Sequence, residues 1–188
     1  MTVLRKDPLL VGSLRYNRLT EKIDVTKVLW WNKEPCVLTN KGRKALRYFF
    51  EKYYGLFNES VMDDALDLEA YSKEYHPICE YLETLEWDGK ERIRNVLKVY
   101  MGADDSDMVY EMLKHFMMGA LNRIYCPGCK FDEMLCLVGQ QGAGKSTFFR
   151  FLALDDQWFS DSLKNLNMEK PYELLRGHWI LEMSEMTA

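Results

Sequence analysis

The sequence predicts an α/β protein of the P-loop NTPase class, in which a mostly α-helical N-terminal part precedes the nucleotide-binding core. Three neighbouring features favour this class: an apolar run at residues 134–138, a glycine-rich stretch at residues 139–147, and an amphipathic stretch at residues 148–152. A strand, a phosphate-binding loop and a helix follow one another in this order in P-loop proteins. The helical part is predicted from apolar residues that recur every three or four positions after residue 39.

The apolar run reads Met-Leu-Cys-Leu-Val and shows no alternation with polar residues. Such a run suits a short strand buried on both faces, as in a parallel sheet. We therefore expect residues 134–138 to form a strand that leads directly into Gly139.

The glycine-rich stretch, here called the phosphate loop (residues 139–147), matches the pattern G-x-x-x-x-G-K-[ST]. Its glycines permit a tight turn and leave no Cβ between the backbone N–H groups and the phosphates. Lys145 is expected to neutralise the β- and γ-phosphates of ATP, and the Ser146 hydroxyl to bind Mg²⁺. A helix beginning at Lys145 would direct its positive end at the same phosphates. The predicted binding residues are Gly139, Gln140, Gln141, Gly142, Ala143, Gly144, Lys145, Ser146 and Thr147.

A second buried strand is predicted at residues 178–181, and acidic residues follow it. An apolar strand that ends in acid downstream of a phosphate loop is typical of a Walker B element, in which one carboxylate holds Mg²⁺ and another activates water. Glu182 is the candidate for the metal side and Glu185 the candidate base, although the two roles could be exchanged. The prediction depends on the phosphate loop, because strands often end in acids.

The composition limits the class of protein. With 188 residues, 47% hydrophobic and 13% aromatic, the chain can build a sizeable core. No apolar run approaches eighteen residues, and the N-terminus lacks the apolar region of a secretion signal, so neither a transmembrane helix nor export is expected. The five cysteines, an odd number with little pattern, suit a reducing interior, and we expect a cytoplasmic protein.

Charge is unevenly distributed along the chain. Residues 1–60 carry 12 Lys and Arg against 6 Asp and Glu, whereas residues 61–188 carry 13 against 23, and the net charge is −4. The basic front part could contact DNA or an acidic partner. An ordinary solvated helix face explains it equally well, so only weak or indirect DNA binding is expected; the basic residues on this face are Lys41, Arg43, Lys44 and Arg47.

Three segments are predicted along the chain. Residues 1–38 are mixed and contain a possible hairpin around residues 17–21, residues 39–104 form a helical domain, and residues 105–188 form the P-loop core. Trp30 and Trp31 lie in the first segment, where packing is the favoured interpretation and base stacking the alternative.

Apolar periodicity and capping residues place the helices. The expected spans are 39–54 closed by Gly55, about 60–75 capped by Ser60 with Asp63 at the capping-box position, 78–85 after the boundary at His76-Pro77, 92–100 closed by Gly102, 106–125 capped by Ser106, and a short helix from Asn167 or Met168 to Leu175.

Cys126-Pro127-Gly128-Cys129 follows the longest of these helices. The Cys-x-x-Cys spacing raises a zinc or redox interpretation, but zinc needs a second pair of ligands, and none lies nearby. A Pro-Gly turn explains the spacing sufficiently. His115, within the preceding helix, is expected to be a structural residue rather than a ligand.

Four strings carry a resemblance to a known family: YLETLEWDG at 81–89, PGCKFD at 127–132, WFSDSL at 158–163 and YELLRGHWI at 172–180. Together they resemble the virulence-associated protein E family of phages, prophages and pathogenicity islands, from roughly residue 4 to the C-terminus. That family is similar to the superfamily 3 helicases, which are hexameric AAA+-type ATPases of mobile-element replication.

The resemblance implies an AAA+-like fold and ATP hydrolysis coupled to DNA unwinding in a bacterial host, beside a primase or another replication partner. It places residues 139–147 in motif A, with Lys145 on the phosphates and Ser146 on the metal. Glu182 and Glu185 would lie in motif B. A homohexamer is the implied assembly of the full-length protein.

This sequence departs from the family pattern because it stops after motif B. A sensor strand, an arginine finger and DNA-gripping loops are expected beyond that point, so the resemblance implies a truncated protein with an incomplete sheet and little hydrolysis of its own. One alternative is a non-catalytic interaction module that regulates a homologue or a replication partner. Another is a different P-loop NTPase or kinase, in which the motif B strand lies directly beside the phosphate-loop strand.

Overall fold

The computed structural model describes residues 1–163 and 175–183 of the chain. The chain divides into two compact units, Met1–Glu80 and Tyr81–Ala188. The division lies near the boundary predicted at His76-Pro77, whereas the segment edges predicted after residues 38 and 104 fall inside the units.

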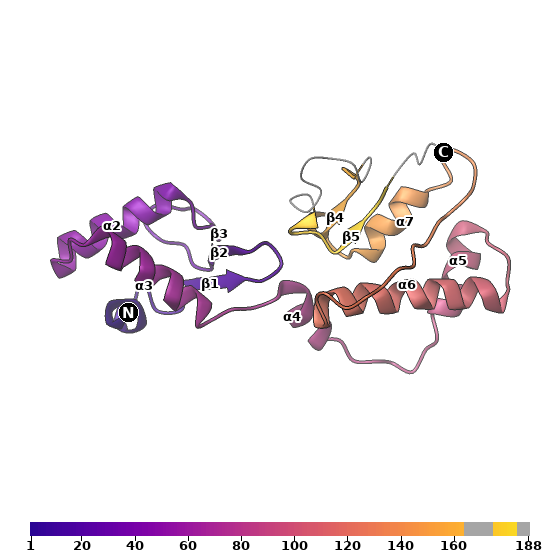
Figure 1. Ribbon diagram of the computed structural model, residues 1–188, viewed down its shortest axis with the longest axis horizontal. Helices are drawn as coiled ribbons and strands as arrows, with labels where there is room; N and C mark the ends of the chain where they lie inside the picture. Colours follow the sequence, from indigo (N-terminus) through magenta and orange to yellow (C-terminus); the bar gives the residue numbers. More distant parts are fainter. Residues whose placement is uncertain (164–174, 184–188) are drawn as a thin grey trace. The chain divides into compact units, whose positions relative to one another are not determined.

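A small antiparallel sheet forms part of the N-terminal unit (Figure 1). Its strands are β1 (Leu14–Asn17), β2 (Lys22–Val25) and β3 (Cys36–Val37), in the order β1-β2-β3. Leu14 pairs with Val25 across the first two strands, which confirms the predicted hairpin. A short helix, α1 (Thr2–Lys6), precedes the sheet.

Two helices complete this unit, α2 (Asn40–Tyr54) and α3 (Glu59–Tyr71). The predicted limits of α2 are confirmed, because Thr39 accepts a hydrogen bond from the Gly42 N–H and Gly55 closes the helix at φ 62°. Both tryptophans pack here: Trp31 is partly buried in the core, and the Trp30 ring stacks on Phe49 at 4.7 Å. The core is made by Leu4, Leu10, Leu14, Ile23, Val25, Leu29, Leu38, Leu46, Phe49, Phe50, Met62, Leu66 and Ala70.

The predicted start of α3 is wrong by two residues. Asn58, not Ser60, is the N-cap, and its side chain accepts a hydrogen bond from the Val61 N–H at 3.1 Å. Asp63 does not complete a capping box, because its carboxylate accepts a hydrogen bond from Arg47 on α2. Asn is as good an N-cap as Ser, so the tertiary position of the helix decides between them.

The C-terminal unit is built on helices. α4 (Pro77–Glu83) joins the two units, and α5 (Ile93–Met101) and α6 (Asp107–Tyr125) follow. Gly102 closes α5 at φ 66°, and Ser106 caps α6, as the sequence predicts. The Cys129 N–H donates to the Cys126 carbonyl at 3.1 Å, which confirms a turn after α6.

The chain then runs back along α6 towards α7 (Lys145–Leu152) (Figure 1). The strand expected at residues 134–138 is wrong, because these residues form no strand in the described structure. Their burial alternates: Leu135 and Leu137 pack on the helices, whereas Val138 is 99% exposed. Burial on both faces requires a layer on each side, and here the helices cover only one.

The second predicted strand is confirmed as β5 (Ile180–Leu181), which pairs in parallel with β4 (Phe159–Ser160). A 3₁₀ turn, η1 (Asp156–Trp158), leads into β4. The Trp179 indole N–H donates to the Ala120 carbonyl at 2.8 Å and so attaches β5 to α6. The helix predicted from Asn167 or Met168 lies almost wholly outside the described residues.

Within the described part of the chain, none of the helices is both long and apolar enough to cross a membrane.

Candidate nucleotide site

The phosphate loop owes its shape to glycine. Gly142 and Gly144 have φ angles of 81° and 79°, in the left-handed region that other residues rarely adopt. The Ala143 N–H donates to the Gln140 carbonyl at 3.3 Å and tightens the turn. The sequence pattern alone predicts this turn, because only glycine meets its backbone requirement at no steric cost.

Helix α7 begins directly after the loop. Its N-cap is Gly144, which offers no side-chain hydrogen bond to the first N–H groups of the helix. Unpaired N–H groups and the helix dipole make such a terminus attractive to phosphate. The predicted helix at Lys145 is confirmed, and the loop and helix together present donors for an anion.

Lys145 remains over its own loop. Its Nζ donates to the carbonyl oxygens of Gly139, at 2.9 Å, and Gln140, at 2.8 Å. The amine therefore lies over the residues predicted to hold phosphate instead of turning away into the protein. Carbonyl contacts of this kind are neutral partners, which a triphosphate would replace with charged ones.

Two residues 36 positions apart meet at the start of α7. The Ser146 hydroxyl donates to Oε1 of Glu182 at 2.6 Å. Glu182 follows β5, and its own N–H donates to the Ser160 carbonyl of β4 at 2.8 Å, which fixes its backbone. The fold thus brings together the two side chains that the sequence predicts as Mg²⁺ ligands.

The second carboxylate oxygen of Glu182 tests whether a cation fits. Oε2 is buried and has no hydrogen-bond partner among the described residues. A buried acceptor without a partner is costly, and a divalent cation would satisfy it. Mg²⁺ is typically held by one or two carboxylates together with phosphate oxygens and water. Ser146 and Glu182 supply two oxygen donors, a set that would leave the remaining positions around such a cation to phosphate oxygens and water.

Other predicted site residues are less constrained. Gln140, Gln141 and Thr147 are exposed on the loop. Glu185 lies outside the described residues, so its predicted role as a base stays a prediction. β5 pairs in parallel with β4, and residues 134–138 pair with no described strand.

Sequence reasoning missed a hollow beside the loop. A cavity of about 520 Å³ is bounded by loop residues Ala143 and Gly144 on one side and by α5 and α7 elsewhere. The signal in the sequence was the apolar face of α5, which carries Val96 and Tyr100. That face could be recognised as a wall only once α5 was placed against α7.

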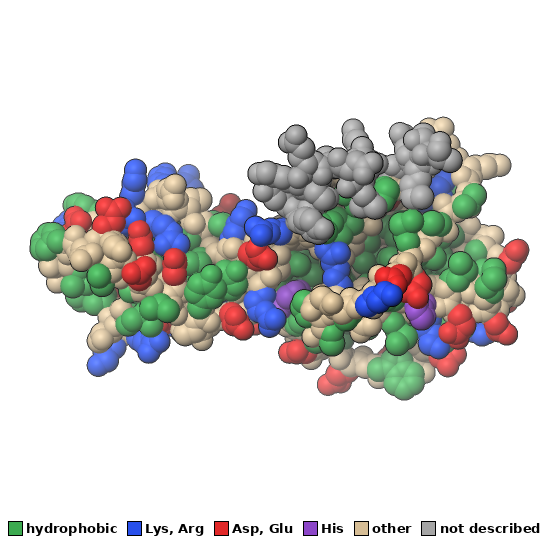
Figure 2. Space-filling model, viewed as in Figure 1, with side chains coloured by type: hydrophobic (Ala, Val, Ile, Leu, Met, Phe, Trp, Pro, Cys, Tyr) green, Lys and Arg blue, Asp and Glu red, His purple; other side chains and the backbone are tan. Residues whose placement is uncertain are grey.

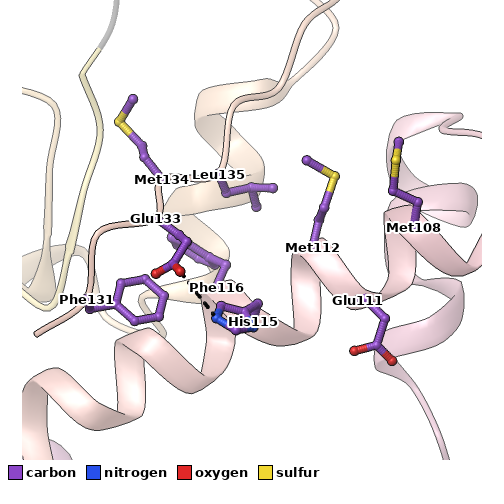
Figure 3. Close-up of a pocket in the computed structure, with 9 residues that line it drawn as sticks. All are labelled: Met108, Glu111, Met112, His115, Phe116, Phe131, Glu133, Met134 and Leu135. Carbon is purple, nitrogen blue, oxygen red and sulfur yellow. Dashed lines mark ion pairs between the residues drawn. The ribbon is translucent and has the colours of Figure 1, made fainter.

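A separate groove lies between α6 and residues 131–135 (Figure 3), with a volume of about 500 Å³. The His115 ring stacks on Phe131 at 5.7 Å, and its Nε2 lies 3.8 Å from a Glu133 carboxylate oxygen. Gly119 faces the same ring, because a Cβ there would lie 2.3 Å from Phe131. These contacts support the prediction that His115 is a structural residue.

Two further predictions concern the cysteines and the charges of the N-terminal unit. The five cysteines form no disulfide among the described residues, and neither Cys126 nor Cys129 belongs to a metal cluster in that part of the chain. On the visible face of the N-terminal unit, basic, acidic and apolar side chains are interspersed (Figure 2). Arg43 and Arg47 form ion pairs with carboxylates of α3, which reduces the basic character predicted from the sequence.

Comparison with known proteins gives one family. The model of the virulence-associated protein E-like domain matches residues 82–188, a range that contains the phosphate loop, β5 and Glu182. No curated protein matches the chain.

Proposed function

The chain belongs to the virulence-associated protein E-like family, and from this premise we propose that its C-terminal unit binds ATP and Mg²⁺ as part of a mobile-element replicative DNA helicase. The observation that carries the proposal is the 2.6 Å hydrogen bond between Ser146 and Glu182. Without an acid beside it, the glycine-rich loop would be indistinguishable from an ordinary turn. An acid aligned with the loop's hydroxyl matches the arrangement that P-loop enzymes use to hold a nucleotide-bound cation.

Each residue has a defined task in this proposal. The N–H groups of the loop and of the first turn of α7 bind the phosphates, and Lys145 exchanges its carbonyl contacts for phosphate oxygens. Ser146 and Glu182 hold Mg²⁺, which offsets the charge of the phosphates when it is bound. Glu185 is the proposed base for the attacking water.

We extend the proposal to the complete enzyme on the strength of the family. Hydrolysis would drive DNA unwinding within a hexamer, beside a primase or another replication protein. An arginine finger from a neighbouring subunit would act on the phosphates, a contribution of roughly 10³–10⁵ in rate in other NTPases. Strand displacement that proceeds equally well with Lys145→Ala subunits would contradict the helicase part.

A second candidate is a non-catalytic interaction module that binds a homologue or a replication partner. The observation in its favour is the segment at residues 134–138, where Val138 is exposed and no described strand pairs with the backbone. Unpaired strand-like segments are ready templates for another chain. Co-purification with a full-length relative tests this candidate, and failure to co-purify would remove it.

The binding test uses the whole chain with MgATP in isothermal titration calorimetry. Lys145→Ala is expected to weaken binding by about 10- to 100-fold, because it removes charged hydrogen bonds to phosphate. Lys130→Ala is the matched control, since this exposed lysine of the same unit pairs only with Asp132 among the described residues. We expect the control to bind ATP like the wild type.

Ser146→Ala and Glu182→Gln test the cation separately. The wild type should bind ATP more tightly with Mg²⁺ than with EDTA, and each variant should lose most of that difference. If Lys145→Ala binds as tightly as the wild type, the assignment of the phosphate loop is wrong. If Ser146→Ala and Glu182→Gln both keep the wild-type difference in affinity between Mg²⁺ and EDTA, the assignment of the phosphate loop is retained and Mg²⁺ is held by other residues.

A further inference from the structure

The cavity of about 520 Å³ beside the phosphate loop has the composition of a site for a flat apolar group. Its walls come from α5 and α7 and consist of Val96, Tyr100, Met101, Phe148, Phe151 and Leu152. Its remaining border is Ala143, Gly144 and Thr147. The part of the lining that the structure describes therefore contains no charged and no amide side chain.

This inference rests on the proposed function, because the cavity shares Gly144 with the loop that is proposed to hold the triphosphate. A nucleotide consists of a charged chain and a flat base joined by a sugar, so its two ends need adjoining polar and apolar surfaces. The N-terminus of α7 provides the polar surface. Phe148 and Phe151, farther along the same helix, provide the apolar surface.

Two aromatic rings at the cavity are largely exposed. Tyr100 is 74% exposed and Phe151 is 75% exposed, although both line the cavity. Because rings this exposed pack little against the rest of the protein, they are available to stack on a base. Beneath them, Val96, Met101 and Leu152 are already anchored to the core cluster of Leu97, Leu113 and Phe148, so the floor of the cavity is preformed.

We propose that this cavity binds the base of a purine nucleoside triphosphate by stacking and apolar contact, with little discrimination between ATP and GTP. Among the described side chains that line the cavity, only those of Tyr100 and Thr147 carry a group, a hydroxyl, that can hydrogen-bond to the base. Sites that discriminate by factors of 10⁴–10⁵ do so through buried hydrogen-bonding groups, which these side chains do not supply. Apolar walls read the shape of the base rather than its pattern of donors and acceptors.

The experiment compares three probes on the whole chain by calorimetry: MgATP, MgGTP and magnesium tripolyphosphate, which lacks a base. The double variant Tyr100→Ala, Phe151→Ala should bind ATP about 5- to 100-fold more weakly, the range expected for loss of stacking on a base. Its affinity for tripolyphosphate should be unchanged.

The matched control is Val99→Ala, which removes an exposed apolar side chain from α5 outside the cavity and should leave all three affinities unchanged. ATP and GTP should bind to the wild type within about tenfold of each other. The proposal is overturned if the double variant binds ATP like the wild type, or if GTP binds on the order of a thousandfold more weakly than ATP. If the wild type binds neither ATP nor tripolyphosphate, the proposed function itself fails, and the base site falls with it.

Discussion

Glu69 is a charged side chain held almost entirely inside the N-terminal unit, with 3% of it exposed. Its carboxylate lies 2.7 Å from Arg5 and 2.6 Å from Lys73. Burial by itself raises the pKa of Glu69, but the hydrogen bonds from Lys73 and Arg5 outweigh burial, and the pKa lies below its ordinary value of 4.5. The ion pairs therefore stabilise the folded state at neutral pH.

Glu69→Gln should destabilise this unit by about 1–3 kcal/mol at neutral pH, because it leaves two cations without their carboxylate. The wild-type stabilisation is present above the unfolded pKa of Glu69 and is lost as pH falls through the lower folded pKa. Wild type and variant should therefore converge in acid. Urea unfolding at about pH 7 and at about pH 3 measures both free energies, and a gap that widens in acid would contradict the argument.

At the candidate site, the shape of the loop follows from one short local pattern. The backbone angles of Gly142 and Gly144 are those that the glycines of this pattern permit. The partner of Ser146 was harder to predict. In the sequence, Glu182 is marked only by its place after an apolar strand, and the folded chain shows its carboxylate in contact with the Ser146 hydroxyl.

At the scale of elements, α3 offers a test of local against tertiary control. Asn58→Ala should cost about 1 kcal/mol, because the side chain satisfies the Val61 N–H at the helix start. Ser60→Ala is the matched control, since Ser60 lies inside the helix, and it should change stability by less than about 0.5 kcal/mol. Chemical denaturation of both variants measures the difference. A larger loss from Ser60→Ala would restore the N-cap predicted from the sequence.

The segment at residues 134–138 shows why a strand is harder to predict than a helix. A helix satisfies its backbone hydrogen bonds within itself, so α2, α5 and α6 could be located by periodicity and caps. A strand requires a neighbour, and these residues pair with no described strand. The apolar composition of this segment predicts burial on both faces. In the structure, the face with Leu135 and Leu137 packs on the helices and the other face is exposed.

For the whole molecule, each unit contains a hydrophobic cluster of its own. The cluster of the N-terminal unit takes its buried residues from the range Leu4 to Ala70, whereas the cluster around Leu97, Leu113 and Phe148 belongs to the C-terminal unit. A core that takes residues from only one unit suggests that each unit can unfold by itself.

We therefore expect residues 1–84 to fold alone with a cooperative thermal transition followed by circular dichroism. Leu46→Ala, which empties a fully buried position, should lower its free energy of unfolding by about 2–5 kcal/mol. A broad, non-cooperative transition for the wild-type fragment would show that this unit depends on the rest of the chain. The control is Tyr48→Ala on the exposed face of α2, which should change little.

The sequence by itself determined α2, α5 and α6, the hairpin of β1 and β2, the second buried strand and the glycine turn before α7, because each depends on residues close together in the chain. The tertiary structure decided which acid meets Ser146, which side of residues 134–138 is covered, and where an apolar hollow forms beside the loop. Those features join segments tens of residues apart. Their geometry depends on how helices pack, and periodicity along one segment does not specify the distance or the angle to another.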